Sequence, residues 1–89
     1  MLATACGSSR PAESREIATF FCVAVRTAHE FADRGRTPEY RRHIRRALRI
    51  AASDDGLARR VTEPLETFDP ADTSRVLAEC REQGLLTVR

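Results

Sequence analysis

Few residues in this chain of 89 are of types that carry out chemistry, since it holds only three cysteines and two histidines. Four of these could together supply a tetrahedral metal set: Cys22, Cys80, His29 and His43. Their spacings are unlike those of compact zinc motifs, and the ligands would have to converge from separate elements. No Ser/His/Asp arrangement, nucleophile elbow or glycine-rich phosphate loop is recognisable, and no pair of carboxylates is placed for acid–base work. We therefore expect a protein that is not an enzyme and that holds no metal and no cofactor.

Cys22 and Cys80 are also the candidates for a disulfide. Cys22 falls in the first predicted helix and Cys80 in the last, and the first and last helices of an up-and-down bundle are neighbours. A bridge would close a loop of about 58 residues, for which the chain-entropy estimate is about 4 kcal/mol. The alternative is a pair of buried free thiols that pack as small hydrophobic side chains. The odd cysteine count agrees with one bridge plus one modified cysteine, and equally with three free thiols in a cytosolic chain.

A basic segment, YRRHIRRALRI, carries the third candidate site. It places five arginines on one arc of a predicted helix with no acidic residue between them: Arg41, Arg42, Arg45, Arg46 and Arg49. Five guanidinium groups on one face attract a polyanion, such as a phospholipid surface, a nucleic acid or an acidic protein. The alternative is a solvated face whose arginines pair with acids of neighbouring helices, such as Asp54, Asp55, Glu63 and Glu66. This face lacks aromatic residues, which argues against binding to single-stranded nucleic acid.

The elements that must position these residues are helices punctuated by proline and glycine. We expect the first helix over residues 11–34, with Pro11 in its first turn and Gly35 at the C′ position. Its apolar residues recur at helical spacing, and Cys22 and Val25 widen the stripe: Ile17, Phe20, Phe21, Ala24, Ala28 and Phe31. A stripe this wide indicates contact with more than one partner helix.

The second and third helices carry the basic segment and a proline. The second is expected to begin with Thr37 as N-cap and Pro38 at the first helical position, and to end near Ala52. Its buried stripe is Tyr40, Ile44, Ala47, Leu48 and Ala51. The third is expected over residues 56–68, with Leu57, Val61, Leu65 and Phe68 on one face. Pro64 lies inside this pattern, so we expect a kink or a split there.

The fourth helix is expected to open with Asp69 as N-cap and Pro70 at the first helical position, and to end at Gly84. Val76, Leu77 and Cys80 should face inward. Leu85 and Leu86 are expected to fold back over the last turn, as in a Schellman ending.

Composition limits the class of protein. All fifteen basic residues are arginine, and the formal net charge is only +2, so the basic character is local. A chain this short buries about 60–65% of its unfolded surface, and no run approaches the ~20 apolar residues of a transmembrane helix. We expect an all-α bundle of about four helices, with a flexible tether over residues 1–10 and a single helical domain over residues 11–89.

The N-terminal stretch LATACGSS places Cys6 after small and apolar residues and before a Gly/Ser tether. It resembles the processing site of bacterial lipoproteins. The likeness extends to a helix reading IATFFCVAV and a last helix reading VLAECREQG, as in small actinobacterial lipoproteins. The resemblance implies that Cys6 is lipidated and that the domain lies at the cell envelope, on the outer face of the cytoplasmic membrane. Only Met1 to Ala5 precede Cys6, so this location requires a leader upstream of the given start, and without one we expect a cytoplasmic protein.

A second resemblance lies at the C-terminus. The stretch TSRVLAECREQGLLTVR looks like the recognition helix and following strand of winged-helix regulators, with LARRV at residues 57–61 as the preceding helix. On that interpretation Thr73, Ser74 and Arg75 would face the major groove of DNA. The connection, residues 62–72, holds two prolines and is longer than the ~3–4 residues of a helix-turn-helix.

We therefore expect a non-enzymatic binding or scaffolding domain that resembles an envelope lipoprotein. Its expected partner is an anionic membrane surface or an acidic protein, and nucleic acid is the weaker candidate. The alternatives are a small cytoplasmic winged-helix-like DNA-binding regulator, and a protein-interaction module such as a toxin–antitoxin partner.

Overall fold

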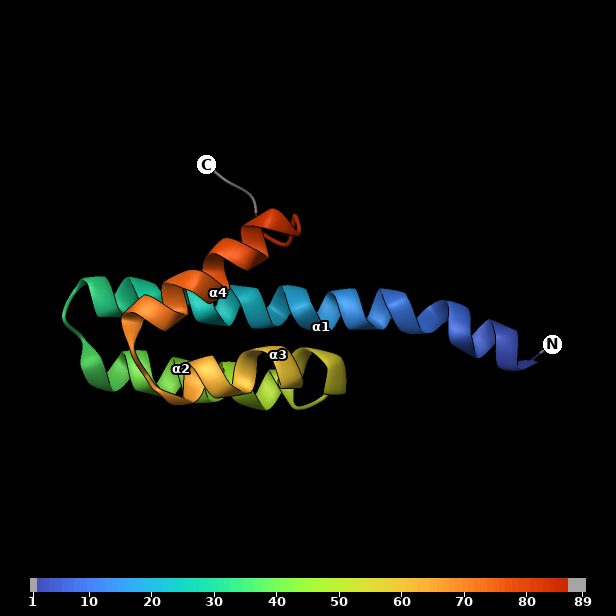
Figure 1. The fold of residues 1–89 in the computed structure, drawn as a ribbon, viewed down its shortest axis with the longest axis horizontal. Helices are drawn as coiled ribbons and strands as arrows, with labels where there is room; N and C mark the ends of the chain where they lie inside the picture. Colours follow the sequence, from blue (N-terminus) through green and yellow to red (C-terminus); the bar gives the residue numbers. More distant parts are fainter. Residues whose placement is uncertain (1, 87–89) are drawn as a thin grey trace.

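The computed structural model describes the backbone of residues 2–86 and the side chains of residues 14–86. This part of the chain forms four helices and no strand: α1 (Leu2–Asp33), α2 (Thr37–Ala51), α3 (Asp55–Glu66) and α4 (Pro70–Glu82). The predicted all-α bundle of four helices is therefore confirmed. Figure 1 shows α1 and α2 antiparallel and side by side, α3 returning along α2, and α4 crossing α1 obliquely.

The first helix is longer than the sequence pattern predicted. It begins at Leu2 and not at Pro11, and it runs past the ends of the other helices (Figure 1). The added segment includes Gly7, Ser8 and Ser9, which are poor helix formers, and it leaves Pro11 inside the helix and not in the first turn as predicted. Cys6 and the other side chains of the predicted tether at residues 1–10 lie outside the described side chains, so the tether and the lipidation stay predictions.

Two glycines end α1 and α4 in the same way. Gly35 and Gly84 both have φ of 72°, in the left-handed region that glycine enters without a Cβ clash. The N–H of each glycine donates to the carbonyl three residues earlier at 3.0 Å, and the next N–H donates to the carbonyl five residues earlier at 2.9 Å. Both are Schellman motifs, as predicted for Gly84, and Gly35 occupies the C′ position predicted for it. The second motif turns Leu85 and Leu86 back onto the core, where Leu86 is buried.

The start of α2 differs from the prediction by one residue. Arg36 is the N-cap, without a side-chain cap hydrogen bond, so Thr37 and Pro38 occupy the first two helical positions. The reason lies in the preceding turn. The Arg36 N–H donates within the Schellman motif of α1, while the Arg36 carbonyl already accepts from the N–H of Tyr40 at 3.0 Å.

Of the kink or split predicted at Pro64, the split is wrong, because α3 runs as one helix with Pro64 inside it, and the kink stays a prediction. Pro64 stands in the last turn, so its missing N–H removes one hydrogen bond and no further turn has to be built beyond it. The helix ends at Glu66, earlier than predicted, and Phe68 adopts a positive φ of 56°. At the other end the Asp54 carboxylate caps α3 by accepting from the N–H groups of Gly56 and Leu57, at 3.1 and 3.3 Å.

The core is formed by one stripe from each helix, as predicted, with one correction on α1. Phe20 is 61% exposed, and its neighbour Val23 is 39% exposed. Both lie at the outer edge of the wide stripe of α1, on the side that only α2 adjoins. The buried hydrophobic residues are Phe21, Cys22, Ala24, Val25, Ala28, Tyr40, Ile44, Ala47, Ala51, Leu57, Val61, Leu65, Val76, Leu77, Cys80 and Leu86.

Cys22 and Cys80 form the predicted disulfide, which joins α1 to α4. Their Cα atoms lie 6.0 Å apart, within the range that a bridge spans without backbone movement. The alternative of two free thiols is therefore wrong, and neither sulfur remains as a thiolate ligand for a metal. None of the helices, as far as the structure describes them, is both long and apolar enough to cross a membrane.

Candidate binding surface

All five predicted arginines of α2 are exposed. Among the described side chains, ion pairs within 4.0 Å join Arg36 to Glu39 and Arg75 to Asp72, and His29 lies 3.8 Å from Asp33. None of these contacts includes an arginine of the set. The expected alternative, pairing with Asp54, Asp55, Glu63 and Glu66, is thus not realised in this part of the chain. All five lie at the surface without a carboxylate within 4.0 Å among the described side chains, although the hydrogen bond from Arg36 and, to a smaller extent, the charge of Arg42 lower the pKa of the Glu39 carboxyl.

The structure divides these arginines into two groups. The guanidinium carbons of Arg41 and Arg45 lie 5.2 and 5.7 Å from the centre of the Phe68 ring. Such contacts are cation–π interactions, each contributing about 0.5–1 kcal/mol at exposed sites. The expectation that no aromatic residue adjoins this face is therefore wrong. Phe68 comes from the α3–α4 turn, so no spacing within α2 could have revealed it.

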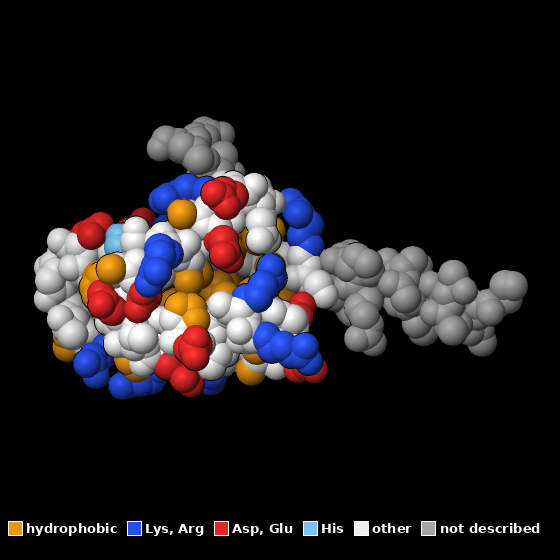
Figure 2. Space-filling view, viewed as in Figure 1, with side chains coloured by type: hydrophobic (Ala, Val, Ile, Leu, Met, Phe, Trp, Pro, Cys, Tyr) orange, Lys and Arg blue, Asp and Glu red, His pale blue; other side chains and the backbone are white. Residues whose placement is uncertain are grey.

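The other three arginines form what we call the outer basic face: Arg42, Arg46 and Arg49. A rotation of about 100° per residue places them opposite the buried residues Tyr40 and Ala47. In Figure 2 basic side chains lie along the edge of the molecule over α2, at the lower left. This face is the free part of the predicted polyanion site.

A groove of about 480 Å³ opens between α1 and α2, beside the outer basic face. Its lining is mostly apolar, and Arg46 is the one arginine in it. The lining residues are Ile17, Phe20, Val23, Ala24, Thr27, His43, Arg46, Ile50 and Ser53. Sequence reasoning missed this groove because it assigned Phe20 to the core. The signal was the width of the α1 stripe, which exceeds what α2 and α4 cover.

The groove has a polar end and an apolar end. Phe31 and His43 stack with ring centres 5.1 Å apart, so Thr27 on α1 lies near the start of α2. Because α1 and α2 are antiparallel, Thr27, His43 and Arg46 share one end of the groove. The other end is formed by Ile17, Phe20 and Ile50, with the Ser53 hydroxyl at its limit.

Two of the polar groups at the end formed by Thr27, His43 and Arg46 have defined hydrogen bonds. His43 Nδ1 lies 2.9 Å from the carbonyl oxygen of Glu39. Since a carbonyl only accepts, Nδ1 carries the proton and Nε2 is left for another partner. The Thr27 hydroxyl donates to the carbonyl of Val23 at 3.0 Å, so it can offer only lone pairs. Arg46 is therefore the strongest donor in the groove.

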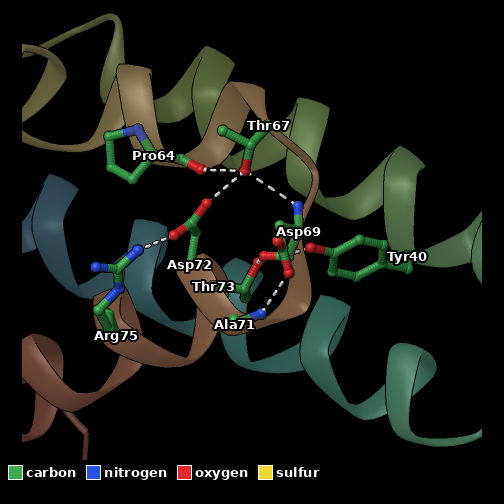
Figure 3. Close-up of polar contacts among 8 residues, drawn as sticks. All are labelled: Tyr40, Pro64, Thr67, Asp69, Ala71, Asp72, Thr73 and Arg75. Atoms are coloured by element: carbon green, nitrogen blue, oxygen red, sulfur yellow. Dashed lines mark hydrogen bonds and ion pairs between the residues drawn. The ribbon is translucent and has the colours of Figure 1, made fainter.

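The α3–α4 turn is held by a separate polar network (Figure 3). The Thr67 hydroxyl accepts from the N–H of Asp69 at 3.1 Å and lies 2.7 Å from a carboxylate oxygen of Asp72. Asp72 also pairs with Arg75. The hydrogen bond with Thr67, followed by the one with Arg75, lowers the pKa of the Asp72 carboxyl below its ordinary value. This network holds the turn and pairs Arg75 with Asp72.

The α3–α4 turn bears on DNA binding in two opposite ways: its length favours a helix-turn-helix, and the burial of Thr73 argues against contact with DNA. The connection from Glu66 to Pro70 is three residues long, so the predicted long connection over residues 62–72 is wrong, and the length suits a helix-turn-helix. Thr73, however, is only 1% exposed and cannot face a DNA groove. Arg75 is paired with Asp72, and Figure 2 shows acidic and basic side chains intermixed over α3 and α4.

Comparisons of this chain with protein-family models, curated proteins and solved structures find no match. Within the described side chains, no group of three or more His, Cys, Asp or Glu residues is arranged to hold a metal ion. The outer basic face and the adjoining groove are thus the surfaces on which a function can be argued.

Proposed function

We propose that this chain is a non-enzymatic binding domain that attaches to anionic membrane surfaces through the outer basic face of α2. The observation that carries the proposal is the exposure of Arg42, Arg46 and Arg49, without a carboxylate partner among the described side chains, next to the exposed Phe20 and Val23. Peripheral membrane proteins combine these two features, because basic groups attract lipid head groups while apolar side chains enter the interface.

Membrane attachment also agrees with the resemblance to envelope lipoproteins. A lipid anchor at Cys6 and a basic patch on the domain would act together, since stable anchoring takes two signals. We propose the outer face of the cytoplasmic membrane as the location. The domain would then act as a scaffold that lies flat against the head groups.

Co-sedimentation with vesicles tests the proposal. The full chain, without a lipid anchor, is mixed with vesicles of phosphatidylglycerol and phosphatidylcholine, and with vesicles of phosphatidylcholine alone. We expect binding to the anionic vesicles only, and weaker binding as salt rises, because exposed charges are screened within about 10 Å at 0.1 M. Each basic residue near the surface contributes about 1 kcal/mol, so Arg42→Gln/Arg46→Gln/Arg49→Gln should weaken binding about 100-fold.

The matched control changes the same number of charges elsewhere. Arg26, Arg59 and Arg81 are exposed on α1, α3 and α4. Replacing these three by Gln lowers the net charge equally, and we expect it to weaken binding far less than the α2 variant. Equal losses in the two variants, or no binding to anionic vesicles at low salt, would contradict the proposal.

A second candidate function, DNA binding through α3 and α4, is favoured by one observation, the three-residue turn between them. Duplex DNA is therefore run in parallel over the same salt series. The buried Thr73 and the Asp72–Arg75 pair argue against this function. Binding to DNA that is lost in Ser74→Glu, and not in the α2 variant, would establish it over membrane attachment.

A further inference from the structure

We infer that the α1–α2 groove binds an anionic single-chain amphiphile, with the acyl chain along α1 and the head group at Arg46. The inference goes beyond the proposed function because it assigns a stoichiometric ligand site that needs no membrane. The groove's volume, about 480 Å³, falls within the size range of small-ligand sites, about 300–1,000 Å³.

The chemistry of the groove walls suits an alkyl chain. Ile17, Phe20 and Ile50 form one end, and Val23 and Ala24 line the middle. Phe20 and Val23 are 61% and 39% exposed, and with Ile17 and Ile50 they line one continuous groove and are not scattered singly over the surface. An alkyl chain laid along these residues would remove their apolar surface from water without moving either helix.

The charge of the groove selects the head group. Arg46 is the one lining residue with a full charge, and no acidic side chain lines the groove among the residues described. The guanidinium of Arg46 presents a planar fork of donors that matches a carboxylate or a phosphate. His43 Nε2 faces no partner within the described hydrogen bonds and lies at the same end. The charged group lies toward one end, and the other end is apolar except for the Ser53 hydroxyl at its limit, which matches the two ends of an amphiphile.

Titration with soluble amphiphiles tests this inference. Dodecanoate, below its micelle concentration, is added to the oxidised full chain and followed by calorimetry and by ¹H–¹⁵N NMR. Butanoate supplies the same head group without the chain, and dodecyl maltoside, also below its micelle concentration, supplies the same chain with a neutral head. We expect one saturable site for dodecanoate, with shifts centred on Thr27, Arg46 and Ile50, and binding at least about tenfold weaker for the other two ligands.

Two variants with matched controls locate the site. Val23→Asp places a negative charge in the groove at a partly exposed position, and Ala78→Asp places the same charge on the exposed side of α4. Arg46→Gln removes the head-group partner, and Arg59→Gln removes an exposed arginine of α3. We expect Val23→Asp to abolish dodecanoate binding, and Arg46→Gln to remove the preference over dodecyl maltoside, with both controls unchanged.

Three results would overturn the inference. Equal loss in Val23→Asp and Ala78→Asp would mean attraction by net charge alone. Equal affinity for the neutral amphiphile in the unmodified protein would mean a groove with no head-group site. Light scattering would show a dimer if a second copy covers the groove. In that case the dimer would not bind dodecanoate, and Phe20→Ser would convert it to a monomer. Failure of vesicle binding with retained dodecanoate binding would remove only the proposed function.

Discussion

The hydroxyl of Tyr40 lies 2.6 Å from the hydroxyl of Thr73 and joins α2 to α4 inside the core. Both residues are nearly inaccessible to water, at 3% and 1% exposure. The Thr73 hydroxyl also lies 3.3 Å from the carbonyl oxygen of Asp69, which can only accept. Thr73 therefore donates to Asp69 and accepts from Tyr40, so one short chain of hydrogen bonds satisfies the buried hydroxyls and fixes the start of α4.

Removing either hydroxyl should destabilise the protein, and the two losses should not add in full because the hydroxyls interact with each other. Tyr40→Phe leaves the Thr73 hydroxyl without its donor, and we expect a loss of about 1–2 kcal/mol in the free energy of unfolding. Thr73→Val should lose a similar amount. In the double variant the losses should be less than additive by at least about 0.5 kcal/mol, as measured by urea denaturation of the oxidised protein. Strict additivity would mean that the two hydroxyls do not interact.

Alkaline pH should destabilise the protein through Tyr40. Burial raises the pKa of Tyr40 above its ordinary value of 10.0. The neutral hydroxyl therefore contributes stability that is fully present below pH 10.0 and is lost as pH rises through the raised pKa of the folded state. The chain has one tyrosine and no lysine, so few other groups titrate in this range. The Cys6→Ser substitution removes the free thiol, which would also titrate at alkaline pH. In this background the free energy of unfolding, measured between pH 9 and 11.5, about the range in which a tyrosine titrates, should show this loss. Tyr40→Phe should flatten the profile, and an unchanged profile would contradict the assignment.

The disulfide should be the largest single contribution to stability that one chemical step can remove. Replacing Cys22 and Cys80 by Ala should lower the free energy of unfolding by about 4 kcal/mol, since the bridge closes a loop of 58 residues. Oxidised protein unfolded in denaturant without reductant should show one reactive thiol, that of Cys6, and reduced unfolded protein should show three. Three reactive thiols before reduction would refute the bridge.

At position 68 glycine should give a more stable protein than alanine, whereas alanine is the more stabilising residue at an ordinary helical position. Its φ of 56° lies in the left-handed region, where a Cβ costs about 1–2 kcal/mol. Phe68→Gly and Phe68→Ala both lose the contacts with Arg41 and Arg45, so their difference isolates the backbone. We expect the Gly variant to be more stable than the Ala variant by about 1 kcal/mol in thermal or urea denaturation.

The control for Phe68 lies on an ordinary helical surface. Ala78→Gly, on the exposed side of α4, should lower stability by about 1 kcal/mol, because glycine is the poorer helix former there. If Phe68→Ala is as stable as Phe68→Gly or more stable, φ at this position relaxes to negative values.

The sequence by itself determined the local features of this protein. Helical periodicity identified the stripes, since the side chains of an amphipathic helix face the core every three or four residues. The two C′ glycines were recognisable because a positive φ is a property of a single residue. The order of the helices made a Cys22–Cys80 disulfide one of two alternatives, beside a pair of free thiols, and the structure decided for the disulfide.

The tertiary structure alone decided which edges of these stripes are covered. Phe20 and Phe21 are adjacent and equally apolar, yet one is 61% exposed and the other 1%, because α2 and α4 together cover only part of α1. The five arginines of one arc separate into two groups only because the α3–α4 turn places Phe68 beside Arg41 and Arg45. Periodicity is a property of one helix, whereas coverage depends on how many helices are available and at what angle they cross.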